Sequence, residues 1–130
     1  IIIQGHVDMV CEKNKGTQHD FMTDPIKVMI DGDWVTADGT TLGADNAIGV
    51  AAGLAVMDDK DLKTGRIELL STFDEETGLT GAFTLDPSLL TGKIMLNLDS
   101  EEEGAIYIGC AGGRDTNMDL PLTEENPHSK

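Results

Sequence analysis

The stretch from residue 66 to residue 76, RIELLSTFDEE, decides the fold class of this chain. Its first part, Arg66–Phe73, is rich in apolar and β-forming residues and predicts a buried strand. Three consecutive carboxylates, Asp74, Glu75 and Glu76, follow that strand directly. A run of charges usually marks a solvated face, but such a face seldom follows a buried strand so abruptly. We therefore expect these carboxylates to serve a function at the end of the strand.

The same pattern, an apolar run that stops at a polar residue, occurs twice more. Ile1–Ile3 precedes His6, and Ile94–Leu96 precedes Asp99. Open α/β sheets place their ligands at the carboxyl ends of the strands. Carboxylates that converge there raise one another's pKa unless a positive charge neutralises them, and no cationic residue is close in sequence. The three segments together predict a metal site at one edge of a sheet.

The other elements place these segments in an α/β fold. Alternating residues in Ile26–Ile30, a turn at Asp31-Gly32 and the run Asp33–Thr36 predict a hairpin. Asn46–Met57 predicts a helix whose small residues let it lie close against a sheet. The remaining predicted elements are a strand over residues 1–5, a short helix over Thr77–Leu85, a buried strand over Lys93–Leu98 and a short β run over Ala105–Gly109. This order favours an incomplete α/β domain with a largely parallel or mixed central sheet flanked by helices.

Length and charge exclude several classes of protein. The 130 residues suffice for one domain, and no apolar run approaches the roughly 20 residues of a membrane span. The net charge of -15 argues against nucleic acid or an anionic membrane as a partner. The start of the chain has no basic region typical of a signal peptide and reads as the middle of a strand. We therefore expect a piece of a longer, cytoplasmic protein.

The two cysteines, Cys11 and Cys110, are too few for a disulfide framework. Reduced thiols are usual in a cytosolic protein. Cys11 lies close in sequence to the expected site, and we expect it to be a small buried side chain rather than a reactive one.

His6 and Asp8 form a His-x-Asp motif. In an extended segment the two side chains lie on the same side, because side chains alternate along a strand. A carboxylate beside a ligating imidazole fixes its tautomer and raises its basicity, so we expect His6 as a metal ligand and Asp8 as its partner. The motif alone is weak, and a surface histidine beside an aspartate is the commoner explanation.

Each of the other candidate residues also has an ordinary structural explanation. Asp45 stands where a helix begins and could be its N-cap, as could Asn46. A nucleotide-binding glycine loop fits poorly, because the GxGxxG spacing and the Walker lysine are absent. In the pair Glu75-Glu76, one carboxylate can bind metal while its neighbour takes a proton from water. Asp99 could belong to a common acidic turn after a strand.

Taken together, these pieces resemble the co-catalytic di-zinc metallopeptidases, a family that includes aminoacylases and several dipeptidases. The family pattern is His-x-Asp, then an Asp-Asn pair, a Glu-Glu pair and an Asp after the next strand, and all four occur here in order. The resemblance is closer still to the bacterial aminoacyl-histidine dipeptidases. The stretches that carry it are GHVDMVCEKN, HDFMTDPI, DGDWVTADGTTLGADNAIGVA, DEETGLTGAF and NLDSEEEGAIYIGCAGG.

The resemblance implies a role for each candidate. His6, Asp45 and Asp99 would bind one zinc ion, and Asp45 would bridge to a second that Glu76 also ligates. Glu75 would be the general base and acid. The resemblance also implies that Asp8 orients His6 and that the peptide bond between Asp45 and Asn46 is cis. Manganese or cobalt would suit the same nitrogen and oxygen ligands.

The resemblance further implies metal-dependent hydrolysis of dipeptides, with Xaa-His dipeptides as the expected substrates. Alternatives are a deacylase of N-acyl amino acids and a non-catalytic cation-binding or interaction module. Residues 1–113 would be the central segment of a catalytic domain, and residues 114–130 the start of a lid or dimerisation region. The family completes the second metal shell with a downstream histidine, which neither His19 nor His128 matches. We therefore expect this segment alone to be inactive. A homodimer is the expected assembly of the full-length protein.

Overall fold

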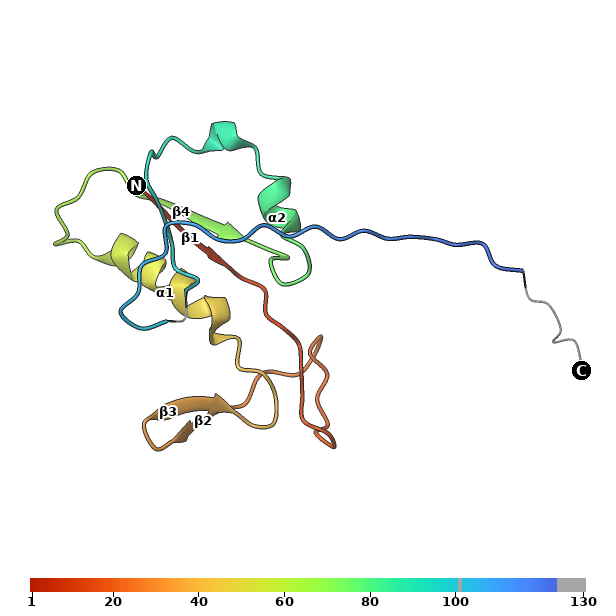
Figure 1. The fold of residues 1–130 in the computed structure, drawn as a ribbon. Helices are drawn as coiled ribbons and strands as arrows, with labels where there is room; N and C mark the ends of the chain where they lie inside the picture. The colour runs from red at the N-terminus through yellow and green to blue at the C-terminus, as the bar shows by residue number, and fades with distance from the viewer. Residues whose placement is uncertain (101, 124–130) are drawn as a thin grey trace, which may run out of the picture.

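The computed structural model describes residues 1–100 and 102–123, which form a small α/β unit with an attached hairpin (Figure 1). Residues 124–130, which belong to the predicted region 114–130 and include His128, lie outside the described part. The described elements are β1 (Ile2–His6), β2 (Val28–Asp31), β3 (Trp34–Ala37), α1 (Ala44–Asp58), β4 (Glu68–Thr72), α2 (Thr80–Phe83), the 3-10 helix η1 (Pro87–Leu89) and β5 (Met95–Asn97). None of the described helices is both long and apolar enough to cross a membrane.

The central sheet has three parallel strands in the order β4-β1-β5. His6 at the end of β1 pairs with Thr72 at the end of β4. On the other side, Gln4 pairs with Asn97 at the end of β5. This topology confirms the predicted fold class, and it brings the carboxyl ends of all three strands to one edge.

Helix α1 lies close against the sheet because glycines face it. A Cβ on Gly53 would lie 2.5 Å from Leu69 Cδ1 and 3.2 Å from Ile3 Cγ2. Glycine costs about 1 kcal/mol against alanine inside a helix, so this packing must compensate for it. The large apolar side chains that are buried in the described residues are those of Ile2 and Ile3, which are 4% and 7% exposed. The core is therefore centred on β1, beneath α1.

The hairpin of β2 and β3 stands away from the sheet (Figure 1). Asp31 pairs with Trp34, so the two turn residues are Gly32 and Asp33, one position later than predicted. Gly32 has a φ of 59°, which glycine adopts without the cost that a side chain would add. The position of the glycine, rather than that of the aspartate before it, therefore sets the turn.

Two predicted strands differ from the structure. β5 forms, but Ile94, Met95 and Leu96 are exposed rather than buried. The segment Ala105–Gly109 forms no strand, and Ile106 and Ile108 are almost fully exposed. In the described part of the chain, β5 is an edge strand with β1 as its one neighbour, so its apolar residues stay about half exposed and no strand pairs with residues 105–109.

Two smaller predictions were also wrong. The predicted helix Thr77–Leu85 is reduced to α2, because Gly78 and Leu79 both have a positive φ and cannot be part of a right-handed helix. Cys11 is exposed, since the loop after β1 leaves it on the surface, where its thiol lies 3.7 Å from the carbonyl oxygen of Met9.

Candidate metal centre

The imidazole of His6 is the centre of the site. It is the last residue of β1, and its side chain is only 1% exposed. Backbone pairing continues one residue past the ends of two strands: Val7, after β1, donates its N–H to Thr72 O of β4 (2.9 Å), and Leu98, after β5, donates its N–H to Gln4 O of β1 (3.0 Å). The loops that follow β4 and β5 therefore leave the sheet beside His6.

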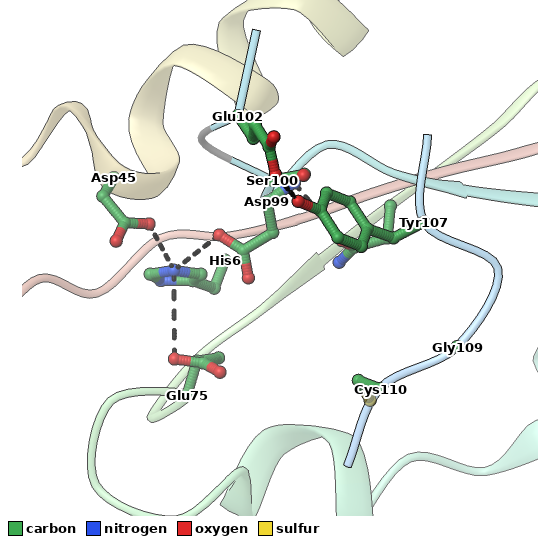
Figure 2. A pocket seen from close by; sticks show the side chains of 10 residues that line it. His6, Asp45, Glu75, Asp99, Ser100, Glu102, Tyr107, Gly109 and Cys110 are labelled. Atoms are coloured by element: carbon green, nitrogen blue, oxygen red, sulfur yellow. Dashed lines mark hydrogen bonds and ion pairs between the residues drawn. The ribbon is translucent and has the colours of Figure 1, made fainter. Parts of the chain in front are cut away.

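Three carboxylates from different parts of the chain surround one nitrogen of this ring (Figure 2). His6 Nε2 lies 3.1 Å from Asp45 Oδ1 and 3.4 Å from Asp99 Oδ1. It lies 4.0 Å from Glu75 Oε2. The structure thus brings together residues that are separated by as many as 93 positions in the sequence, as the positions of the strand ends predicted.

The other ring nitrogen of His6 faces Asp8. Nδ1 lies 3.0 Å from the backbone carbonyl oxygen of Asp8 and 3.4 Å from its Oδ1. A proton on Nδ1 that is donated to this carbonyl leaves the lone pair of Nε2 directed at the carboxylates. The carboxylate contact was expected from the His-x-Asp spacing, but the carbonyl contact was not, because a backbone hydrogen bond leaves no mark in the side-chain sequence.

The carboxylate of Asp8 connects the histidine to the acidic loop. Its Oδ2 accepts a hydrogen bond from the backbone N–H of Glu76 (3.2 Å). Burial alone would raise the pKa of Asp8, but the backbone N–H groups of Glu75 and Glu76 outweigh it and lower the pKa. Oδ1 of Asp8 is buried without a hydrogen bond. The ionised carboxylate is thus held between the ring and the loop after β4.

Asp45 is not the N-cap of α1. The N-cap position is Gly43, which has no side chain to cap the helix, and the backbone dihedrals of Asp45 and Asn46 are not helical. The peptide bond between these two residues is cis, as the resemblance implied. The carboxylate of Asp45 contacts His6 instead of the helix backbone. Asn46 is not a cap either, because its side chain bonds to the backbone of His6 and Leu98.

The cluster carries more negative charge than its surroundings balance. Burial, the hydrogen bond with Asp45 and the charges of Asp45 and Glu75 raise the pKa of Asp99 to about 6, although His6 opposes them. Burial alone would lower the pKa of His6, but Asp99 and Asp45 outweigh it and raise the pKa. Within residues 1–100 and 102–123, the ion pairs of lysine and arginine lie elsewhere, at Lys27–Asp38 and Arg66–Glu68.

The donor set suits a divalent cation. One potential ligand atom each from His6, Asp45 and Glu76 lies within 4.8 Å of the other two. Imidazole nitrogen and carboxylate oxygen are ligands that zinc accepts, and a cation would relieve the repulsion that raises the pKa of Asp99. The residues present therefore fit a bound metal ion.

A cavity of about 580 Å³ opens beside the cluster. His6, Glu75 and Asp99 line one part of it, and Tyr107 and Cys110 line another. Tyr107 donates a hydrogen bond from its hydroxyl to Glu102 (Figure 2). The sequence did not point to Tyr107, because it lies in the run Ala105–Gly109 that suggested an ordinary strand. Cys110 follows that run and was expected only to be a reduced thiol. The cavity is large enough to receive a small molecule next to His6.

Two comparisons with known proteins found related sequences and structures. The cytosol non-specific dipeptidase of Escherichia coli (strain K12) is 53% identical over 125 residues, which are 96% of this chain and 26% of that protein. The crystal structure of aminoacylhistidine dipeptidase from Vibrio alginolyticus matches with a TM-score of 0.77 and 59% identity, over 80% of this chain and 21% of that one. The chain is homologous to one segment of these dipeptidases.

A further relative matches a shorter part of the chain. The uncharacterized protein YqjE of Bacillus subtilis (strain 168) is 39% identical over 80 residues, which are 58% of this chain and 22% of that protein. A scan against protein-family models found no match. The chain spans about a quarter of the length of the curated relatives it matches. Its fold matches a fragment of a peptidase-like domain.

Proposed function

We propose that this chain is part of a metal-dependent peptidase that hydrolyses dipeptides. The observation that carries the proposal is the single buried imidazole with three carboxylates within 4.0 Å of its Nε2, at the carboxyl edge of a parallel sheet. The dipeptidase names of two relatives, each more than half identical over the aligned residues, support the substrate class. Zinc is the proposed metal, with manganese or cobalt as alternatives.

Two ions would be held by residues of the cluster. His6, Asp45 and Asp99 would ligate the first, and Asp45 and Glu76 would take part in ligating the second. The contacts of His6 Nε2 with Asp45 and Asp99 support the first set, and the proximity of Asp45 to Glu76 supports the second. Bound cations would supply Lewis acidity toward water and toward the peptide carbonyl.

Glu75 is the proposed general base and acid. Its carboxylate lines the cavity and stands 4.0 Å from His6 Nε2, on the side away from Asp45 and Asp99 (Figure 2). From there it would take a proton from the attacking water and pass it to the leaving amine. Asp8 accepts a hydrogen bond from the backbone N–H of Glu76 and contacts His6 Nδ1. It would therefore fix the position of the acidic loop relative to the imidazole ring.

The substrates, partners and location of the whole protein follow from the same proposal. Xaa-His dipeptides are the proposed preferred substrates. The name aminoacylhistidine dipeptidase of one relative supports this preference, and the name non-specific dipeptidase of the other supports a wider range of dipeptides. The net charge of -15 disfavours nucleic acid and anionic membranes as partners. A cytoplasmic location and a homodimeric full-length protein complete the proposal.

The test uses the full-length protein that contains this chain. Hydrolysis of a panel of Xaa-His and other dipeptides is measured beside hydrolysis of N-acetyl amino acids, before and after removal of metal by a chelator. The proposal predicts dipeptide hydrolysis that the chelator abolishes and added zinc restores. Hydrolysis of N-acetyl amino acids alone, or activity that is indifferent to the chelator, would overturn it.

A further inference from the structure

The carboxamide of Asn46 bridges the two strand ends that carry the proposed ligands His6 and Asp99. Its Oδ1 accepts a hydrogen bond from the backbone N–H of His6 (3.2 Å). Its Nδ2 donates to the backbone carbonyl of Leu98 (2.5 Å), the residue directly before Asp99. Asn46 is 3% exposed, so water does not compete for either bond. One side chain thus ties together the backbone at the ends of β1 and β5.

Two glycines, Gly5 and Gly49, leave room for the side chain of Asn46. A Cβ on Gly5 would lie 2.2 Å from Asn46 Oδ1, and a Cβ on Gly49 would lie 2.7 Å from the same atom. Real Cβ atoms do not approach so closely, so both positions must lack a side chain for Asn46 to reach the two strands. The carboxamide is therefore enclosed by the strand before it and the helix after it.

The hydrogen bonds of Asn46 lie beyond the last backbone hydrogen bond between β1 and β5. In the part of the chain that the structure describes, the ladder between β1 and β5 ends with the bond from Leu98 N to Gln4 O (3.0 Å). Beyond that bond, the link from His6 to Leu98 runs through the side chain of Asn46. The separation of His6 from Asp99 therefore depends on this carboxamide as well as on the sheet.

We propose that Asn46 is a positioning residue of the metal site, which sets the separation of His6 from Asp99. The inference rests on the proposed function, because it assumes that both residues ligate one ion. Metal ions tolerate only small deviations in ligand distance, on the order of 0.2 Å. Groups that orient ligands without touching the metal typically change its affinity by about 10–100-fold when they are lost.

The test replaces amides by leucine at two positions in the full-length protein. Asn46→Leu removes two hydrogen bonds of the carboxamide while keeping a similar volume. The matched control is Gln4→Leu on the same strand, which also loses two side-chain hydrogen bonds, to Thr72 Oγ1 (3.2 Å) and Asn97 Nδ2 (2.5 Å). Metal affinity is measured by competition with a chromophoric chelator, and coordination by the visible spectrum of the cobalt form.

We expect Asn46→Leu to lower metal affinity by about 10–100-fold and to change the cobalt spectrum. Gln4→Leu should keep affinity and spectrum close to those of the wild type, even if it unfolds more easily. Unchanged affinity and spectrum in folded Asn46→Leu, or equal losses in both variants, would overturn the inference. If Asn46→Leu does not fold, Asn46→Ser, whose hydroxyl is too short to reach both strands, must show the same loss.

The outcomes also separate this inference from the proposed function. Wild-type protein that binds no stoichiometric metal would overturn both. Wild-type protein that binds metal but hydrolyses no dipeptide would overturn the function, while the effect of Asn46→Leu on affinity would still decide the role of Asn46.

Discussion

His6 is the residue on which the site depends. Its ring is buried at the end of β1, with carboxylates at one nitrogen and the backbone and side chain of Asp8 at the other. Such a ring cannot turn without breaking contacts at both nitrogens. The acidic residues therefore meet around a ring of fixed orientation, and the function proposed for each follows from its position relative to that ring.

Glu75 and Glu76 are neighbours with different expected functions. In the full-length protein, Glu75→Gln should keep its metal but lower kcat by about 10²–10⁴-fold, because an amide cannot accept the proton. Steady-state kinetics and metal analysis of the same preparation check this. A kcat near that of the wild type would show that Glu75 is not the base.

Glu76→Ala should instead reduce the metal content by one ion per chain. The alanine removes a carboxylate whose oxygen lies within 4.8 Å of potential ligand atoms of His6 and Asp45. Metal analysis after dialysis against metal-free buffer gives the stoichiometry, and Glu75→Gln serves as the control that retains both ions. Full metal content in Glu76→Ala would contradict the proposed ligand set.

Sequence alone predicted which side chains converge, but not the backbone bonds that hold them. The residue types of His6, Asp45, Glu75 and Asp99, each next to an apolar run or a helix, were enough to predict that they meet. The carbonyl of Asp8 and the bridge made by Asn46 involve backbone atoms, which every residue has. No pattern of side chains can therefore reveal them.

Helix α2 supports the acidic loop through a close backbone approach. Gly81 N donates to Phe73 O (3.1 Å), and a Cβ on Gly81 would lie 2.4 Å from that oxygen. Gly81→Ala should therefore lower the free energy of unfolding of the full-length protein by about 1–3 kcal/mol, because the backbone must shift.

Gly65→Ala is the matched control for this change. A Cβ on Gly65 would meet nothing within 4 Å, and alanine at a compatible glycine tends to stabilise slightly by restricting the unfolded chain. Urea denaturation of both variants makes the comparison. Equal stability of the two variants would show that the contact between Gly81 and Phe73 is dispensable.

Glu68 joins β4 to the segment before β5 in a way that depends on pH. Its carboxylate accepts hydrogen bonds from the hydroxyl and N–H of Thr91 and the N–H of Gly92. These bonds, the Thr91 hydroxyl first, and the nearby Arg66 lower the pKa of Glu68 from 4.5 to about 2. The stabilisation is therefore complete above pH 4.5 and is lost as the pH falls from 4.5 toward 2.

Glu68→Gln should flatten the dependence of stability on pH in that window. Denaturation curves at several values between pH 4.5 and 2 give the slopes for wild type and variant, since the wild-type slope includes the protonation of Glu68. The exposed Glu103→Gln serves as the control and should keep the wild-type slope. Identical slopes for the wild type and Glu68→Gln would contradict the account.

The elements themselves were predicted better than their burial. Strands β1, β4 and β5, the hairpin and the regular part of α1 form close to their expected positions, because their periodicity and turn residues are local properties. The exposure of β5 and the missing strand at Ala105–Gly109 are not local. A side chain is buried, and a strand is paired, only where another segment packs against it. The local sequence pattern of β5 or of Ala105–Gly109 does not show whether such a segment is present.

The molecule as a whole brings three strand ends to one edge of its sheet but has a small core. Two large apolar side chains are buried in the described residues, and the chain spans about a quarter of its curated relatives. We therefore expect the isolated 130 residues to hydrolyse dipeptides no faster than the same chain with Glu75→Gln. Robust hydrolysis by the isolated chain would show that the cluster needs no further ligands.

Metal analysis of the full-length protein by anomalous X-ray diffraction tests the central claim most directly. We expect two divalent ions per chain, one of them within bonding distance of His6 Nε2, Asp45 and Asp99. Crystals of the active protein with no anomalous peak at this cluster, or with the imidazole of His6 turned away from an ion bound elsewhere, would contradict it.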